Sequence, residues 1–110
     1  MPLACRLLEF AASPAALEIQ ELPSTPPGSG EVVLRMLAAS VNPADINVIE
    51  GTYGELPVLP VTIGNEGTGI ISQIGTNVKG LEVGAPAIVL RSGTWTSEMR
   101  VSASRSFLFP

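Results

Sequence analysis

One stretch of the sequence changes its character twice within a few residues: Ala39-Ser40-Val41-Asn42-Pro43-Ala44-Asp45-Ile46-Asn47-Val48-Ile49-Glu50-Gly51-Thr52-Tyr53-Gly54. Asn42 is a favoured N-cap residue, and Pro43 suits the first helical position because its missing N–H needs no partner there. Gly51 is the residue type that most often ends a helix. The stretch therefore predicts a short helix over Ala44–Glu50, with a strand before it and a loop after it.

The flanking sequence is typical of strands and turns. The loop after the helix, Thr52–Pro60, contains Tyr53, Gly54 and two prolines, so it must be irregular. Loops on a rigid scaffold are where sites usually lie. The run Leu17–Leu22 alternates with period two and predicts a hairpin with Leu3–Phe10. Further strands are expected at Glu31–Val41, Val61–Ile74, Ala85–Leu90 and Thr94–Val101. Together they predict a mainly β fold, a partly open barrel with one or two short helices.

Composition restricts the class of protein. The 110 residues suffice for one domain, 45% of them are apolar, and the net charge is −4. Arginines are scattered singly, without the basic stripe that nucleic acids or anionic membranes require. Cys5 is the only cysteine, which fits a reducing compartment and predicts a small buried apolar side chain. With no secretory signal visible, a cytoplasmic location is expected.

Several kinds of chemistry are missing from this sequence. It has no histidine and one cysteine, so a Ser-His or Cys-His pair and a structural zinc site of thiolates and imidazoles are all excluded. A phosphate-binding G-x-G-x-x-G motif is also absent, since Val33 and Ser72 occupy the third glycine position after Gly28-Ser29-Gly30 and Gly67-Thr68-Gly69. We interpret both glycine runs as turns or bulges.

Four sequence blocks, in this order, resemble a known family. They are the stretch from Ala39 to Gly54, Ile63–Gly69, Ile74–Leu81 and Gly93-Thr94-Trp95. This order resembles the N-terminal GroES-like domain of zinc-free medium-chain dehydrogenases/reductases. The Asn-Glu-Gly of the second block and the Gly-x-Tyr after the helix resemble the mitochondrial-type 2-enoyl thioester reductases. The zinc-dependent members carry Cys and His where this chain has Asn42 and Asn65, and an amide is a poor zinc ligand.

The resemblance implies a function for particular residues. Tyr53 matches the tyrosine that is the proton donor of the reductases, while the structural alternative is a loop tyrosine packed on Pro57 and Pro60. Asn42 and Asn47 are expected near the nicotinamide or the substrate carbonyl, although Asn42 also serves as an N-cap. Trp95 is expected to begin the last strand and either to wall the acyl pocket or to lie half-buried in the core.

Two carboxylates near the motif blocks have structural explanations. Asp45 fits the electrostatics of a helix start. Glu66 is expected to accept backbone hydrogen bonds where the glycine-rich segment turns.

The resemblance also implies what surrounds the chain. Relatives continue into a Rossmann domain, so residues 1–110 are expected to be a catalytic substrate domain truncated before the cofactor-binding domain. The expected activity is NADPH-dependent reduction of an enoyl-CoA or enoyl-acyl-carrier-protein. The alternatives are a quinone-oxidoreductase-like activity and a non-catalytic GroES-like module. No metal is expected. The chain is expected to self-associate through exposed apolar surface.

Overall fold

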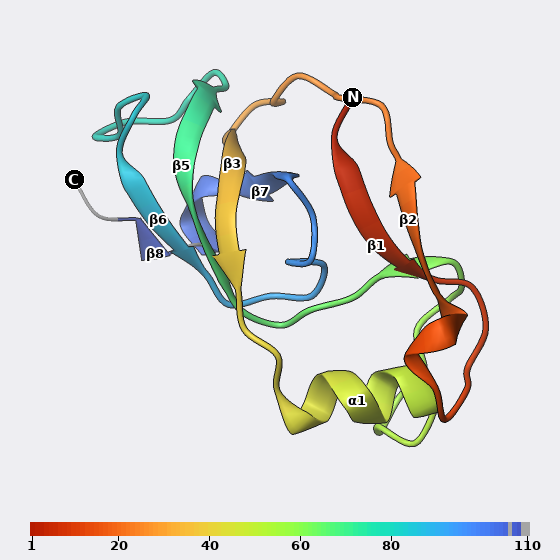
Figure 1. Cartoon of the computed structure of the whole chain (residues 1–110). Coiled ribbons are helices and arrows are strands. Elements are labelled where there is room, and N and C mark those ends of the chain that lie inside the picture. The colour runs from red at the N-terminus through yellow and green to blue at the C-terminus, as the bar shows by residue number, and fades with distance from the viewer. Residues whose placement is uncertain (106, 109–110) are drawn as a thin grey trace.

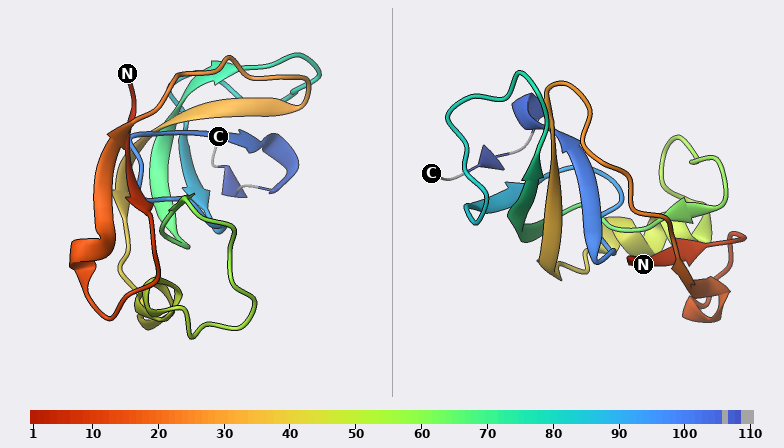
Figure 2. Two further views of the ribbon diagram at one scale, coloured as in Figure 1. Left: turned by 90° about the vertical axis from the view of Figure 1, so that its right-hand side faces the viewer. Right: turned by 90° about the horizontal axis from the view of Figure 1, so that it is seen from above.

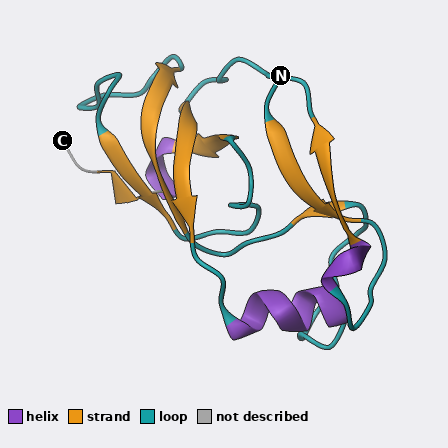
Figure 3. Ribbon diagram, viewed as in Figure 1, coloured by secondary structure: helices purple, strands orange, loops and turns teal. Residues whose placement is uncertain are grey.

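The computed structural model describes residues 1–105 and 107–108. Strands dominate, as the sequence predicts, and they form two open sheets rather than one closed barrel (Figures 1 and 3). The three-stranded sheet has the order β2-β1-β4 and the five-stranded sheet the order β7-β3-β5-β6-β8. Seen from above, the helix α1 lies on the side of the three-stranded sheet (Figure 2). No helix in the described part of the chain is long and apolar enough to cross a membrane.

The three-stranded sheet contains the predicted hairpin. Strands β1 (Leu3–Leu7) and β2 (Leu17–Glu21) pair antiparallel, with the short 3-10 helix η1 (Pro14–Ala16) between them. The two-residue strand β4 (Val61–Thr62) pairs with the other edge of β1. Buried Leu7, Ile49 and Ile63 form a core between this sheet and α1.

The five-stranded sheet is built around β3 (Glu31–Ala39), which pairs antiparallel with both β5 (Gly67–Ile74) and β7 (Glu98–Ser102). Strands β6 (Pro86–Val89) and β8 (Phe107–Leu108) follow on the side of β5, and the 3-10 helix η2 (Ala103–Arg105) precedes β8. The sheet encloses a second core of buried side chains: Val32, Leu34, Ile71, Ala87, Val89, Met99 and Val101.

Helix α1 (Pro43–Glu50) starts one residue earlier than the predicted range and ends where it was predicted to end. Its start is fixed by Asp45, whose Oδ2 accepts a hydrogen bond from the Asn42 N–H at 2.8 Å. Its end is fixed by Gly51, which adopts a left-handed φ of 78° and donates its N–H to the carbonyls of Asn47 and Val48. A carboxylate near the N-terminus and a left-handed glycine at the C-terminus both satisfy backbone groups that the helix itself leaves open.

The predicted strand Val61–Ile74 is wrong in one respect, because it divides into β4 and β5, which belong to different sheets. The break lies at Gly64, which is buried and has a φ of 113°. A Cβ atom on Gly64 would lie 2.5 Å from Trp95 Cδ1, so only glycine fits between the two sheets here.

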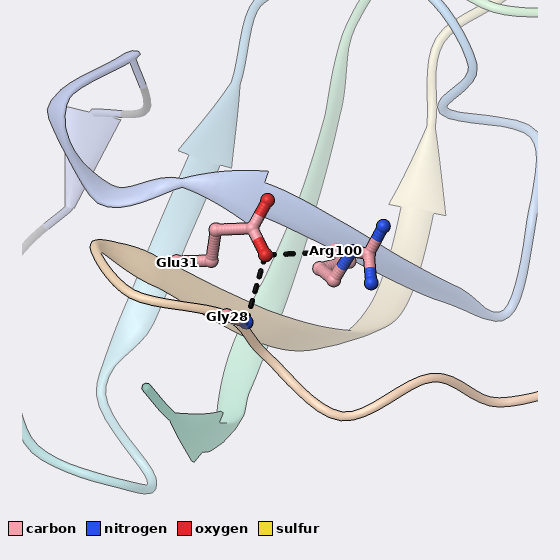
Figure 4. Close-up of polar contacts among 3 residues, drawn as sticks. All are labelled: Gly28, Glu31 and Arg100. Atoms are coloured by element: carbon pink, nitrogen blue, oxygen red, sulfur yellow. Dashed lines mark hydrogen bonds and ion pairs between the residues drawn. The ribbon is translucent and has the colours of Figure 1, made fainter. Parts of the chain in front are cut away.

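The loop before β3 is tied to the larger sheet through Glu31 (Figure 4). Glu31 Oε1 accepts a hydrogen bond from the Gly28 N–H at 2.8 Å and lies 3.5 Å from Arg100 Nε on β7. Earlier in the same loop, Ser24 Oγ donates to Glu98 Oε2 at 2.8 Å. These contacts hold the connection between the two sheets against β7.

Candidate functional site

A cavity of about 410 Å³ lies between α1, the loop that follows it and the strand β4. Its apolar walls come from Val48, Leu56, Pro57, Val58, Val61 and Ile63. Its polar lining comes from Asp45, Tyr53, Glu55, Thr62, Asn65 and Ser92. A mostly apolar cavity with a few convergent polar groups is the usual form of a small-molecule site. We therefore treat it as the candidate site and refer to it as the Tyr53 cavity.

A second depression is larger, at about 710 Å³, and lies at the opposite end of the five-stranded sheet. Its lining includes Ser29, Asn77, Lys79 and Ser102. None of the predicted site residues lines it, and its position beside turns gives it no apolar wall comparable to that of the Tyr53 cavity. Volume alone therefore does not make it the better candidate.

Tyr53 is the predicted site residue that the structure places in this cavity. It follows the C-terminal glycine of α1, and its side chain is 49% exposed. Its hydroxyl makes no hydrogen bond within the described part of the chain, so it is free to donate to a ligand. Pro57 lines the same cavity, so the Tyr53 ring can pack on Pro57 in addition to any chemical role of its hydroxyl.

Asn42 and Asn47 lie beside the cavity and not in its lining. The Asn42 Nδ2 group is 3.2 Å from Ser40 Oγ and 3.4 Å from Glu66 Oε1, on the side facing β5. Asn47 acts through its backbone, since its carbonyl accepts from the Thr52 N–H at 2.9 Å and holds the start of the Tyr53 loop. Glu66, which the sequence predicts as an acceptor of backbone hydrogen bonds, instead has a side-chain amide as its partner.

Trp95 lies before β7, which begins at Glu98 and not at Thr94 as predicted. Its indole packs against the core of Leu7, Ile49 and Ile63 and is half-buried. Its Nε1 donates to the Ser40 carbonyl at 3.0 Å. The ring is not part of the lining of the Tyr53 cavity. It contacts Gly64, and Gly64 does line the cavity.

Sequence reasoning missed several polar residues that line the cavity. Asp45 was interpreted only as a helix-start carboxylate, yet it is 1% exposed and faces the cavity. The signal was available, because Asp45 and Val48 are three residues apart and so share one helix face. Ser92 and Thr62 carried no such signal, since their placement depends on how distant segments pack.

The chain offers little that fits a metal or a dinucleotide phosphate. Among the described residues no group of three or more histidine, cysteine, aspartate or glutamate side chains is arranged to hold a metal ion. Gly67 and Gly69 lie within strand β5, and Gly28 and Gly30 lead into β3, so neither run forms a turn from strand to helix. At the N-terminus of α1 the Asp45 carboxylate already accepts a hydrogen bond from the N–H of the N-cap residue Asn42. These residues therefore do not fit a pyrophosphate.

Comparison with known proteins identifies the class. Residues 28–106 match the family model of the alcohol dehydrogenase GroES-like domain, and the chain belongs to that family. This is the N-terminal domain of the medium-chain dehydrogenases/reductases, which are oxidoreductases.

Curated relatives give a finer comparison. The chain is 38% identical over 112 residues to the synaptic vesicle membrane protein VAT-1 homolog of Rattus norvegicus, covering 99% of this chain and 28% of that protein. It is 42% identical over 84 residues to the mitochondrial enoyl-[acyl-carrier-protein] reductase of Rattus norvegicus, covering 74% of this chain and 22% of the reductase. The chain thus spans about a quarter of the length of the curated relatives it matches.

Solved structures confirm the fold. The human synaptic vesicle membrane protein VAT-1 homolog-like protein superimposes with a TM-score of 0.89 at 25% identity, over 100% of this chain and 36% of the other. A mycobacterial quinone oxidoreductase gives 0.83 at 25% identity, over 100% and 34%. A mycobacterial protein in complex with NADPH gives 0.83 at 26% identity, over 98% and 34%.

Proposed function

We propose that this chain is the N-terminal substrate domain of a longer, zinc-free, NADPH-dependent reductase of the C2=C3 double bond of 2-enoyl thioesters, with Tyr53 as the proton donor. The observation that carries the proposal is the unpartnered Tyr53 hydroxyl in a cavity with mostly apolar walls. The mitochondrial enoyl-[acyl-carrier-protein] reductases, 42% identical over 84 residues, supply the substrate class. The single cysteine fits a reducing compartment, and we assign the protein to the cytoplasm.

The proposed chemistry divides between this chain and the rest of the enzyme. Because the residues of this chain do not fit a pyrophosphate, NADPH would be held by a cofactor domain outside these 110 residues and would supply the hydride for C3 of the substrate. The electron pair of the double bond then moves toward the thioester carbonyl, and C2 needs a proton. The Tyr53 hydroxyl gives that proton to C2 and regains one from solvent through its exposed side.

The other cavity residues support binding. The apolar wall formed by Val48, Leu56, Val61 and Ile63 suits an acyl chain. Asn65, in the position where zinc-dependent members carry histidine, presents a neutral amide that can donate to a thioester carbonyl. Asn42 and Asn47, which are not in the cavity lining, remain proposed contacts to the nicotinamide or the substrate carbonyl.

The experiment is a steady-state assay of the full-length protein with NADPH, in which a short trans-2-enoyl-CoA is compared with a quinone. We expect efficient turnover of the thioester and little of the quinone. The isolated 110-residue chain is the control and should neither oxidise NADPH nor bind it with micromolar affinity in calorimetry. Preference for the quinone would contradict the proposal.

A quinone reductase is the second candidate function, and the similarity to the mycobacterial quinone oxidoreductase favours it. Quinone reduction needs a hydride acceptor site and no proton donor at carbon. A full-length protein that reduces quinones equally well with and without the Tyr53 hydroxyl would support this candidate. A protein without either activity would support a non-catalytic GroES-like module.

A further inference from the structure

The segment 53–59, which carries Tyr53, is attached to the fold only at its two ends. Within the described chain no residue from Tyr53 to Leu59 donates or accepts a hydrogen bond. Its side chains are largely exposed, with Val58 at 89% and Tyr53 at 49%. Such a segment samples many conformations unless its ends are fixed, because few buried contacts or hydrogen bonds restrain it. The position of the Tyr53 hydroxyl therefore depends on the residues at those ends.

The first end is fixed by the C-terminus of α1. The Thr52 N–H and Oγ1 both donate to the Asn47 carbonyl, at 2.9 and 3.4 Å. Gly51 packs against Phe10, where an added Cβ would lie 2.9 Å from the ring. The Ala11 N–H donates to the Ile49 carbonyl at 2.9 Å, which ties the same turn to the chain after β1.

At the second end Leu59 packs against the core of Leu7, Ile49 and Ile63, and β4 pairs with β1. One side chain, Arg6 of strand β1, adds hydrogen bonds to this end. Its Nη2 donates to the Pro60 carbonyl at 3.3 Å, and its Nη1 donates to Thr62 Oγ1 at 3.1 Å. Arg6 thus spans the last residue of the loop and the strand β4 that follows it. Thr62 also lines the Tyr53 cavity.

Among the described residues Arg6 has no carboxylate partner, although Glu18 lies opposite it in the β1–β2 register. Its Nε is buried and has no hydrogen-bond partner in the described structure. Leaving a buried donor unpaired lowers stability, so an arginine in this position is not explained by folding alone. The fork of a guanidinium, which reaches two acceptors at once, does explain it.

We propose that Arg6 is a positioning residue for Tyr53: it fixes the C-terminal end of the segment 53–59 and so holds the Tyr53 hydroxyl in the cavity. This inference deepens the proposed function and depends on it for the effect on turnover. The effect on the position and mobility of Tyr53 stands without it.

The first test uses the 110-residue chain and the fact that Tyr53 is its only tyrosine. Incorporated 3-fluorotyrosine then gives a single ¹⁹F resonance. In Arg6→Gln we expect this resonance to move toward its value in the urea-denatured chain. The matched control is Arg35→Gln, which removes an exposed strand arginine and should leave the resonance unchanged. A resonance in folded Arg6→Gln that coincides with the wild type overturns the proposal.

The second test is kinetic and uses the full-length enzyme. Misplacing a reacting group by about an ångström costs up to about a hundredfold in rate, so kcat of Arg6→Gln should fall on the order of ten- to a hundredfold. KM for the enoyl-CoA and the melting temperature should change little. If Arg6→Gln does not fold, Arg6→Lys keeps the charge and loses the fork, and is measured in both tests.

The outcomes separate the two proposals. No turnover by the wild-type enzyme contradicts the proposed function, while the ¹⁹F result still decides the role of Arg6. Wild-type turnover with an unchanged kcat in a folded Arg6 variant overturns the positioning role and leaves the proposed function intact.

Discussion

The indole Nε1 of Trp95 donates a hydrogen bond to the carbonyl oxygen of Ser40 at 3.0 Å and so joins two motif blocks that are distant in sequence. Ser40 is held a second time, because its N–H donates to the Glu66 carbonyl at 3.2 Å. Its Oγ also accepts from the Asn42 amide. The segment from β3 to α1 is therefore held in place by hydrogen bonds that join Ser40 to Trp95, Glu66 and Asn42.

Trp95→Phe should lower the free energy of unfolding by about 1 kcal/mol, the usual net contribution of one hydrogen bond, plus the cost of an unpaired Ser40 carbonyl. The ring still fills most of the core position, so packing survives. Trp95→Ala is the comparison and should cost about 3–5 kcal/mol, because it also leaves a cavity beside Leu7 and Ile63. Denaturant unfolding monitored by circular dichroism measures both. Equal losses in the two variants would contradict the packing contribution, because both variants lose the hydrogen bond. No loss in Trp95→Phe would contradict the contribution of the hydrogen bond.

Gly64→Ala should be more destabilising than Gly80→Ala. Both glycines have positive φ, 113° and 77°, so alanine strains the backbone at either position, which costs on the order of 1–2 kcal/mol. At Gly64 the added methyl would also lie 2.9 Å from the backbone nitrogen of Trp95, whereas at Gly80 nothing lies within 4 Å. Overpacking adds about 1–3 kcal/mol. The difference between the two unfolding free energies reports the close approach together with the greater backbone strain at the larger φ of Gly64. A difference of zero contradicts the prediction.

Gly64 also shows which part of the fold could not be predicted from the sequence. The helix start at Asn42-Pro43, the helix end at Gly51 and the hairpin of β1 and β2 were all predicted, because each depends on residues a few positions apart. The division of the run Val61–Ile74 depends instead on Gly64 meeting Trp95, a contact across about thirty residues that no local pattern contains.

The candidate site likewise has a part that the sequence predicts and a part that it does not. Tyr53 could be placed in a loop after the helix from its neighbours alone, and the structure adds that the loop borders a cavity. Arg6 could not be connected with that loop, because the link requires the register of β1 with β4. Trp95 was predicted either as a pocket wall or as a core residue, and its half-buried ring packs in the core beside Ile49.

Cys5 should react slowly with thiol reagents in the folded chain. Burial raises the pKa of the Cys5 thiol above its usual value, since desolvation disfavours the thiolate. At mildly alkaline pH the thiolate fraction, and with it the alkylation rate, is therefore lower than in the urea-unfolded chain. Because the chain has one cysteine, the rate reports this site alone. A folded chain that reacts as fast as the unfolded one would refute the prediction.

The isolated chain should self-associate at high concentration. Several large apolar side chains in and near α1 in the sequence are exposed, including Leu37, Val41, Ile46 and Val58. Apolar surface of this kind is typical of faces that are covered in an assembled protein. Light scattering over a concentration series, with hydrophobic dye binding, measures it. A monomer at every concentration without dye binding contradicts the prediction, and Val58→Ser is the variant that should weaken association.

Tyr53→Phe in the full-length enzyme should reduce turnover far more than it raises KM. The ring stays in the cavity beside Pro57, so binding of the acyl chain is preserved and only the hydroxyl is lost. General acid catalysis contributes about 10²–10⁴-fold, so kcat and kcat/KM should fall together by that order. Because the hydroxyl has no hydrogen-bond partner in the described chain, the melting temperature should not change. Asn42→Ala provides the contrast, since it removes the contacts to Ser40 and Glu66 and should lower the melting temperature as well. Wild-type kcat in Tyr53→Phe, with an unchanged melt, would mean that Tyr53 only lines the cavity and that the proton comes from another donor.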